Sequence, residues 1–488
     1  MKLFFTGHDE KFAIEQMLFT LFPAELPVYP AKPPGGEGEL EVRLWESSGT
    51  FRAEARLRLG AREYFATEVR TYDCAATAIE ISRQRRRCLQ RAFYLASVQA
   101  LPAEPHWGML SGVRPVKLPT RWLMEGAGEA EAEARLREEF HVSPHRCRLA
   151  MDCARESMAA LRQLSSSDVS LYIGIPFCPS RCAYCSFISA AGQNNRLMEP
   201  YLSALLEEIA AAGESMIRAG KRISSVYIGG GTPTTLSADQ LRLLMSAIKE
   251  HFHLDPNIEY TVEAGRPDTI TEEKLQVILD GGGNRISVNP QSTSDKVLQA
   301  MGRSHSASAF RSAADLVQGF GFRAVNMDLI AGLPEDSFAG FSESLSEVIA
   351  RSPENITVHT LALKKGARLR EDGGKFPSAE TVSQMLSFAA EALRGAGYAP
   401  YYLYRQKYSS GSFENIGWCK KGFSSLYNIC MMEELHTVLS LGAGGISKIV
   451  DYGRGSLFRA ANPKYPQDYL GNLARILEEK DCFPFDGN

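Results

Sequence analysis

The feature that most constrains the fold is a regular alternation of short β-rich runs and amphipathic helical stretches from Ser170 to about Arg405. Six strand–helix units in succession predict a parallel sheet with right-handed crossovers, either an open doubly wound sheet or a barrel that need not be complete. In such α/β folds the functional groups lie at the carboxyl ends of the strands. The expected strands are Ser170–Phe177, Ser225–Gly230, Glu259–Gly265, Arg285–Pro290, Ala324–Gly332 and Asn355–Leu363.

Three cysteines follow the first expected strand. Cys178, Cys182 and Cys185 have the spacing C-x3-C-x2-C. Three thiolates at this spacing can hold three irons of a four-iron cluster and leave one iron open to a chelating ligand, which favours an enzyme. Zinc prefers four closed ligands, and the neighbouring sequence offers no second cysteine pair or histidine. A zinc site and plain core packing are the alternatives.

Other expected strands also carry polar residues or glycines at or near their carboxyl ends. Gly229–Thr232 completes the second strand, Glu263 lies at the end of the third, Gln291 follows the fourth and Asp328 lies within the fifth. Consecutive glycines let a ligand approach the backbone closely, although each feature alone is typical of a turn or a helix cap. Their convergence predicts one polar ligand site. Gly281–Gly283 precedes the fourth strand and predicts only a turn.

A separate α+β module is predicted upstream, over residues 1–165. A helix over Glu10–Phe22 precedes two alternating runs, ELEVRLWE and FRAEARLRL, whose period of two predicts a hairpin. Helical patterns then cover Ala75–Leu101 and Glu129–Leu164. The serines of LRQLSSSDVS, between Leu161 and Ser170, mark the boundary. The second domain is expected over residues 166–400.

The first of these two helical patterns carries an arginine cluster made of Arg83, Arg85, Arg86, Arg87 and Arg91. No aromatic residues interleave with it, so a solvated helix face paired with acidic residues is favoured over a nucleic-acid surface. A formal net charge of -3 also does not indicate binding to nucleic acid. No apolar run approaches the roughly 20 residues of a membrane span. The charged start MKLFFTGHDEKF does not resemble a secretory signal, which predicts a cytoplasmic, reducing location.

The last region, residues 401–488, is expected to be an α/β extension that covers the barrel mouth. It begins with the aromatic and basic stretch YYLYRQKY and continues through Trp418, Lys420 and Lys421. Such residues can shape a flat pocket.

Together, these motifs resemble the radical S-adenosylmethionine (radical SAM) enzymes, and more narrowly the oxygen-independent coproporphyrinogen III oxidase group. The resemblance rests on Tyr172, the cysteine motif, YIGGGTPT, the Glu263 strand, RISVNPQS with Arg303 twelve residues beyond Gln291, and NMDLIAGLP. The N-terminal module, GVRP at Gly112–Pro115, YYLYRQKY and LGAGGISK are similar to its HemZ branch of coproporphyrinogen dehydrogenases. The implied fold is a partial, TIM-like (β/α)6 barrel.

The resemblance also implies the cofactors, a 4Fe-4S cluster and S-adenosylmethionine. Cys178, Cys182 and Cys185 correspond to the cluster ligands. The implied S-adenosylmethionine site consists of Tyr172, Tyr184, Gly230, Gly231, Thr232, Glu263, Gln291, Arg303 and Asp328, with Arg303 at the carboxylate. A 5'-deoxyadenosyl radical would be formed there, after reduction by an electron donor such as flavodoxin or ferredoxin.

The implied reaction is the oxidative decarboxylation of two propionates, which converts coproporphyrinogen III to protoporphyrinogen IX. A tetrapyrrole with four carboxylates needs cationic partners, and basic residues follow the last barrel strands. These residues are Lys364, Lys365, Arg368, Arg405 and Lys407. The alternative is that these basic residues lie on a solvated loop and bind no substrate.

One position departs from the pattern of the family. Phe187 stands where classical members carry a further cysteine, two positions beyond Cys185. The related heme chaperones share that difference, so a heme carrier is the first alternative. Its candidate heme ligands are His359, His436, Met431 and Met432, and the two histidines could instead be core residues. A radical SAM enzyme acting on another tetrapyrrole is the second.

Overall fold

The structure is a computed structural model that describes residues 1–30, 35–185, 190–191, 196–362, 369, 375–406, 413–451 and 456–485. The chain forms two compact units. The first comprises Met1–Val113 and Glu125–Met151, and the second comprises Arg114–Met124 and Asp152–Asn488. Helix α5 (Pro144–Leu161) begins in the first unit and continues in the second. The domain boundaries expected at residues 165 and 400 stay predictions.

The first unit is an α+β structure, as predicted. Its sheet has the strand order β1-β2-β3-β4 in the described residues, with β1 parallel to β2 and the other pairs antiparallel. The predicted hairpin is β2–β3, and alternate residues of β3 such as Phe51 and Leu57 are buried against α2. Strands β1 and β4 were not predicted. The elements are β1 Lys2–Thr6, α1 Lys11–Leu21, β2 Glu39–Ser47, β3 Thr50–Leu59, β4 Arg62–Thr71, α2 Ala78–Val98 and α4 Glu129–Glu138.

Acidic side chains surround the arginine cluster on α2. The ion pairs are Arg85–Glu46, Arg86–Glu10, Arg87–Glu139 and Arg91–Glu68, with N to O separations of 3.4, 3.2, 3.7 and 3.3 Å. These acids come from four different places in the first unit. The paired helix face that the sequence favoured is therefore present.

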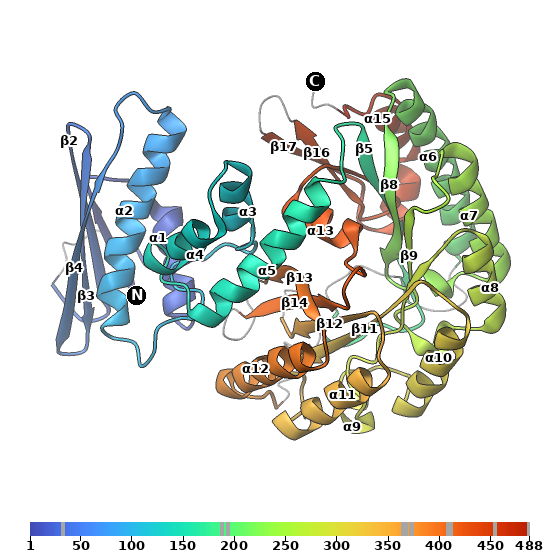
Figure 1. Ribbon diagram of the computed structural model, residues 1–488. Coiled ribbons are helices and arrows are strands. Elements are labelled where there is room, and N and C mark those ends of the chain that lie inside the picture. Colours follow the sequence, from blue (N-terminus) through green and yellow to red (C-terminus); the bar gives the residue numbers. More distant parts are fainter. Residues whose placement is uncertain are drawn as a thin grey trace. The chain divides into compact units, whose positions relative to one another are not determined.

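The second unit contains the predicted run of six parallel strands, each hydrogen-bonded to the next in chain order. Figure 1 shows α6, α7, α8, α10 and α11 along the outer side of these strands. Strand β10 ends at Ser287, earlier than predicted, and Pro290 has no N–H to offer a ladder. Gly281–Gly283 forms the predicted turn, with Gly282 at a φ of 93°. The barrel strands are β5 Asp168–Ile175, β8 Arg222–Gly230, β9 Glu259–Glu263, β10 Arg285–Ser287, β11 Ala324–Ala331 and β12 Asn355–Thr360.

Helices follow the strands as the alternation predicts. They are α6 Met198–Arg218, α7 Ala238–His251, α8 Glu272–Asp280, α9 Asp295–Ala300, α10 Ala307–Gly319, α11 Phe338–Ala350 and α12 Ala379–Gly395. Two 3-10 turns, Pro233–Thr235 and Pro267–Thr269, follow β8 and β9. Helix α3 (Lys117–Met124) also belongs to the second unit.

The barrel is partial because its two outer strands pair with further strands of the same sheet. In the described residues β5 is bonded to β15, which continues to β16 and β17, whereas β12 is bonded to β14, which continues to β13. These elements form the predicted C-terminal α/β extension. Its elements are β13 Ala399–Arg405, β14 Glu414–Cys419, α13 Leu426–Glu433, β15 Thr437–Leu441, β16 Ile446–Asp451, β17 Ser456–Ala461, α14 Pro466–Gly471 and α15 Leu473–Asp481.

One segment of the extension lies at the amino-terminal end of the barrel. Glu259 at the start of β9 caps α13 by accepting bonds from Ser425 Oγ and two backbone N–H groups, at 2.8 to 2.9 Å. Arg285 and Asn355, which start β10 and β12, donate to the Phe423 carbonyl at 3.0 and 2.9 Å. This end is opposite the predicted site. Coverage of the barrel mouth by the rest of residues 401–488 stays a prediction.

Candidate functional site

The cysteine loop, residues Cys178–Cys185, begins at the short strand β6 (Phe177–Cys178), directly after β5. Of its three cysteines, Cys182 is buried, and Cys178 and Cys185 are partly buried. The loop is held by a hydrogen bond from the Ala183 N–H to the Met301 carbonyl at 2.9 Å. Within the described residues, no group of three or more Cys, His, Asp or Glu side chains converges as a metal site. The loop thus brings the thiols to one strand end, and their role as ligands stays a prediction.

The glycine turn after β8 lies directly against the cysteine loop. The N–H groups of Gly231 and Thr232 donate to the carbonyls of Ile175 and Phe177 at 2.8 and 2.7 Å. A Cβ on Gly231 would stand 2.5 Å from the Phe177 oxygen and 3.0 Å from Cys178 Sγ. Thr232 Oγ1 lies 3.5 Å from the same sulfur. Because these two N–H groups already have protein acceptors, the turn contributes close backbone packing beside a thiol rather than donors for a ligand.

Glu263 is a partly buried carboxyl group at the end of β9. It accepts hydrogen bonds from Tyr227 Oη at 2.5 Å and from the Gly230 N–H at 3.3 Å. Burial raises the pKa of Glu263 to about 7, although both hydrogen bonds act in the opposite direction. The Tyr227 ring stacks on Tyr427, with centroids 4.4 Å apart, and Tyr172 lies 6.3 Å from each. This three-ring layer provides an apolar environment near the carboxyl group.

Asp328 and Gln291 lie next to each other beyond Glu263. Asp328 accepts a hydrogen bond from Asn326 Nδ2 at 2.7 Å, and His359 Nε2 lies 3.7 Å from its other oxygen. Burial alone would raise the pKa of Asp328, but these donors outweigh it and lower the pKa below its usual value. The Gln291 N–H donates to the Asp328 carbonyl at 2.9 Å, with Gln291 at a φ of 63°.

The amide oxygen of Gln291 is the clearest sign of a ligand site. The residue is 8% exposed, and its Oε1 has no hydrogen-bond partner in the part of the chain that the structure describes. A buried acceptor without a partner costs free energy, so it indicates a donor group that a ligand would bring.

Arg303 connects the neighbouring strand ends to the cysteine loop. Its guanidinium donates to Tyr184 Oη at 3.1 Å and to the carbonyls of Gly265 and Asn289 at 2.8 and 3.1 Å. Its Nε donates to His305 Nδ1 at 3.3 Å. A carboxylate bound by Arg303 would therefore share donors that already have protein partners.

Few of the expected substrate residues can be placed. Lys364, Arg368 and Lys407 lie outside the described residues, whereas Arg405 ends β13 and is buried. Of the histidines, His436 is fully buried with Nε2 2.7 Å from Ser170 Oγ, and burial lowers its pKa to about 4. His436 is therefore a core residue, which is the alternative to a heme ligand that the sequence analysis gave for it.

Two residues that the sequence analysis did not assign lie among these groups. Tyr227 bonds to Glu263, and Arg266 bonds to the cysteine loop. A signal for Tyr227 existed, because a residue two positions before Gly229 shares its face of the strand. The signal for Arg266 is its charge just after the end of β9, at the end of the strand where functional groups are expected.

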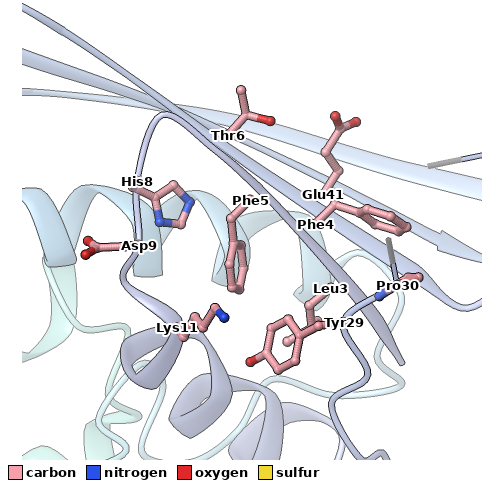
Figure 2. Close-up of a pocket in the computed structure, with 10 residues that line it drawn as sticks. All are labelled: Leu3, Phe4, Phe5, Thr6, His8, Asp9, Lys11, Tyr29, Pro30 and Glu41. Carbon is pink, nitrogen blue, oxygen red and sulfur yellow. The ribbon is translucent and has the colours of Figure 1, made fainter. Parts of the chain in front are cut away.

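A separate pocket of about 390 Å³ lies in the first unit (Figure 2). Phe5 stands between His8 and Tyr29, with ring centroids 5.0 and 5.9 Å away, and Lys11 Nζ lies 4.7 Å from the Tyr29 ring centroid. Both ring nitrogens of His8 have backbone partners, at Val42 and Glu10. None of the predicted site residues lines this pocket.

Comparisons with known proteins define the class first. Residues 172–348 match the family model described as the radical SAM superfamily. The structure is similar to that of coproporphyrinogen III oxidase (HemN) from Escherichia coli, with a TM-score of 0.53 and 23% identity over 65% of this chain and 72% of that one. This likeness confirms the predicted fold, a partial TIM-like barrel.

Sequence relatives narrow the class to a family. The chain is 40% identical over 381 residues to the oxygen-independent coproporphyrinogen-III oxidase-like protein HemZ of Bacillus subtilis, covering 77% of this chain and 76% of that protein. It is 29% identical to the heme chaperone HemW of Haemophilus influenzae, covering 65% and 79%. The chain therefore belongs to the HemZ family of oxygen-independent coproporphyrinogen-III oxidase-like proteins, within the radical SAM superfamily.

Membership of this family confirms the resemblance that the sequence motifs indicated. The cofactors of a radical SAM protein are a 4Fe-4S cluster and S-adenosylmethionine, as predicted. Among the described residues, no helix combines the length and the apolar character that a membrane span requires.

Proposed function

We propose that this protein catalyses the oxygen-independent oxidative decarboxylation of coproporphyrinogen III to protoporphyrinogen IX. The observation that carries the proposal is the 40% identity to HemZ, because it extends over 381 residues and thus well beyond the 172–348 segment shared with radical SAM proteins in general. The presence of the radical-generating motif in a chain with the partial barrel fold is consistent with it.

In this proposal Cys178, Cys182 and Cys185 ligate the cluster. The chemistry of the donor set fits, since three thiols in one loop leave one iron of a four-iron cluster without a protein ligand. The missing side chain at Gly231 fits as well, because it lets the glycine turn pack directly against the backbone of Phe177 beside Cys178. When bound and reduced, the cluster and S-adenosylmethionine supply the radical that removes a hydrogen atom from the substrate propionate.

The remaining site residues bind and orient the cofactor. The unpaired Gln291 Oε1 is placed to accept a hydrogen bond from an ammonium or hydroxyl group. Asp328 stays ionised beside it, while Glu263 holds or releases a proton near neutral pH. The Tyr172–Tyr227–Tyr427 layer excludes water from this side of the barrel. Tyr184, Gly230, Thr232 and Arg303 complete the proposed set.

Two kinds of partner belong to the proposal. The substrate is a tetrapyrrole with four carboxylates, and the cations assigned to it are Lys364, Arg368, Arg405 and Lys407. A small electron carrier such as flavodoxin or ferredoxin reduces the cluster. A radical SAM reaction on another tetrapyrrole would use the same cofactor residues.

A specific observation favours a second candidate, a heme carrier. The chain is 29% identical to a heme chaperone, and Phe187 replaces the further cysteine of the classical enzymes. His359 is the histidine that this candidate needs, since the buried His436 has its Nε2 bonded to Ser170.

The deciding experiment uses reconstituted protein under anaerobic conditions. Coproporphyrinogen III, S-adenosylmethionine, a strong reductant and an electron acceptor are added, and tetrapyrroles and methionine are quantified by chromatography. Formation of protoporphyrinogen IX with two methionines per product supports the decarboxylase. A parallel sample receives heme instead of coproporphyrinogen III; stoichiometric heme retention there, with no turnover in the first sample, refutes the decarboxylase and supports the carrier.

A further inference from the structure

Arg266 is a buried cation that contacts the cysteine loop from outside it. The residue is 3% exposed, and its Nη1 donates to the Ser180 carbonyl at 3.3 Å and to Ser180 Oγ at 3.2 Å. Its Nη2 also donates to Ser180 Oγ, again at 3.2 Å. Ser180 lies midway between Cys178 and Cys182, so these bonds act on the part of the loop that sets the separation of two thiols.

The guanidinium is itself held in place on its other side. Asp268 accepts from Nε and Nη2, both at 3.1 Å, which is the bidentate geometry of a strong ion pair. Asp268 lies in the 3-10 turn Pro267–Thr269 that follows β9, and Arg266 is the N-cap residue of this turn, whose carbonyl accepts from the Thr269 N–H at 3.0 Å. Ser304 Oγ accepts from Nη2 and donates to Asp268. Asp268 and Ser304 therefore hold the guanidinium of Arg266 independently of the loop.

We infer that Arg266 is a positioning residue, which fixes the segment between Cys178 and Cys182 in the shape that retains the cluster. The inference rests on the proposed function, because it takes these cysteines as cluster ligands. A planar fork is needed for this role, since it bonds Asp268 and Ser180 at the same time. Lysine carries the same charge but cannot make both sets of bonds.

The second unit supplies a matched control at Arg285. This residue is 7% exposed, starts a strand of the same sheet and donates to Asn355 and to the Phe423 carbonyl. It lies at the amino-terminal end of the barrel, away from the cysteine loop. Loss of Arg285 should thus lower stability without acting on the thiols.

The experiment measures how fast iron leaves the reconstituted, full-length protein under anaerobic conditions when a ferrous chelator is added. Arg266→Gln should release iron about tenfold faster than the wild type, because hydrogen bonds of a charged group to the loop are lost. Arg266→Lys should fall between the two. Arg285→Gln should release iron at the wild-type rate, even if it lowers the melting temperature as much as Arg266→Gln does. Parallel losses of stability and iron in both glutamine variants would overturn the inference.

Ser180→Ala tests the same contact from the loop side and disturbs folding little. It should speed iron release about threefold, and it should add less than about twofold when combined with Arg266→Gln, because the two changes remove shared bonds. A wild-type rate for Ser180→Ala overturns the inference, even if the arginine variant does not accumulate. Cys182→Ala separates the two failures: if it keeps its iron, the ligand assignment itself is wrong, whatever Arg266 does.

Discussion

The pKa of Glu263 makes the barrel interior sensitive to pH, and Glu263→Gln tests this directly. The pKa of this carboxyl group is about 7 in the folded protein against an ordinary value of 4.5. A group whose pKa is raised by folding stabilises the folded state below the ordinary value and loses that contribution as pH rises through the raised one. Wild-type stability should therefore fall between about pH 4.5 and 7 because of this group.

The size of the effect follows from the same two pKa values. The two pKa values differ by about 2.5, and a pKa difference of one corresponds to about 1.36 kcal/mol. The free energy of unfolding should therefore change by at most about 3 kcal/mol. Glutamine keeps an acceptor for Tyr227 but turns an NH2 group toward the Gly230 N–H, at a cost of about 1 kcal/mol. The variant should thus be less stable than the wild type by about 1 kcal/mol at pH 4, about equally stable near pH 5, and more stable by about 2 kcal/mol at pH 8.5.

Urea unfolding of the apo protein, followed by tryptophan fluorescence from pH 4 to 8.5, measures this crossover as a change in the difference between midpoints. Glu250→Gln, at an exposed position on α7, is the control and should change the free energy of unfolding little at any pH. A constant difference between Glu263→Gln and the wild type across the pH range would refute the reasoning, because the burial of the charge would then have no energetic consequence.

Three further outcomes are expected. Cys182→Ala should abolish the visible absorption of the reconstituted cluster and all cleavage of S-adenosylmethionine; unchanged iron would contradict the ligand assignment. Gln291→Ala and Asp328→Asn should each weaken S-adenosylmethionine binding about tenfold in equilibrium dialysis while iron content stays the same. His436→Gln should remove an acid sensitivity of stability. The pKa of His436 is lowered to about 4 by burial, so its contribution is full above its ordinary value of 6.5 and is lost as pH falls toward 4. Melting curves at pH 4.5 and 7.5 should show a smaller difference for this variant than for the wild type.

The periodic parts of the fold were predictable because burial imposes the period. The six barrel strands and the β2–β3 hairpin each carry the expected apolar pattern, and the structure places them within a few residues of prediction. The pairing of the outer strands of the sheet was less predictable from the sequence. Strands β14 and β15 pair with β12 and β5 over gaps of many residues in the sequence, and a choice between distant partners depends on packing of the whole unit.

The chemically specific contacts were not predictable, because they depend on strand register. In the β8–β9 pair, Tyr227 is opposite Thr261, which brings the tyrosine hydroxyl within reach of Glu263. In the β11–β12 pair, His359 is opposite Ile330, which sets it beside Asp328. A shift of either register by one residue would move these side chains to the other face of the sheet. The sequence therefore indicates which residue types gather at the mouth, but not which of them form pairs.

The same limit applies to the cysteine loop, because the spacing of its cysteines alone does not define where a cluster would lie. The loop leaves β5 and is held by residues that follow three other strands: Thr232 after β8, Arg266 after β9, and Arg303 beyond β10. A loop anchored in this way takes its shape from the relative positions of those strand ends. Substitutions at the anchors should therefore alter cluster retention without touching a thiol, whereas the spacing of the cysteines reports only that a cluster can be bound.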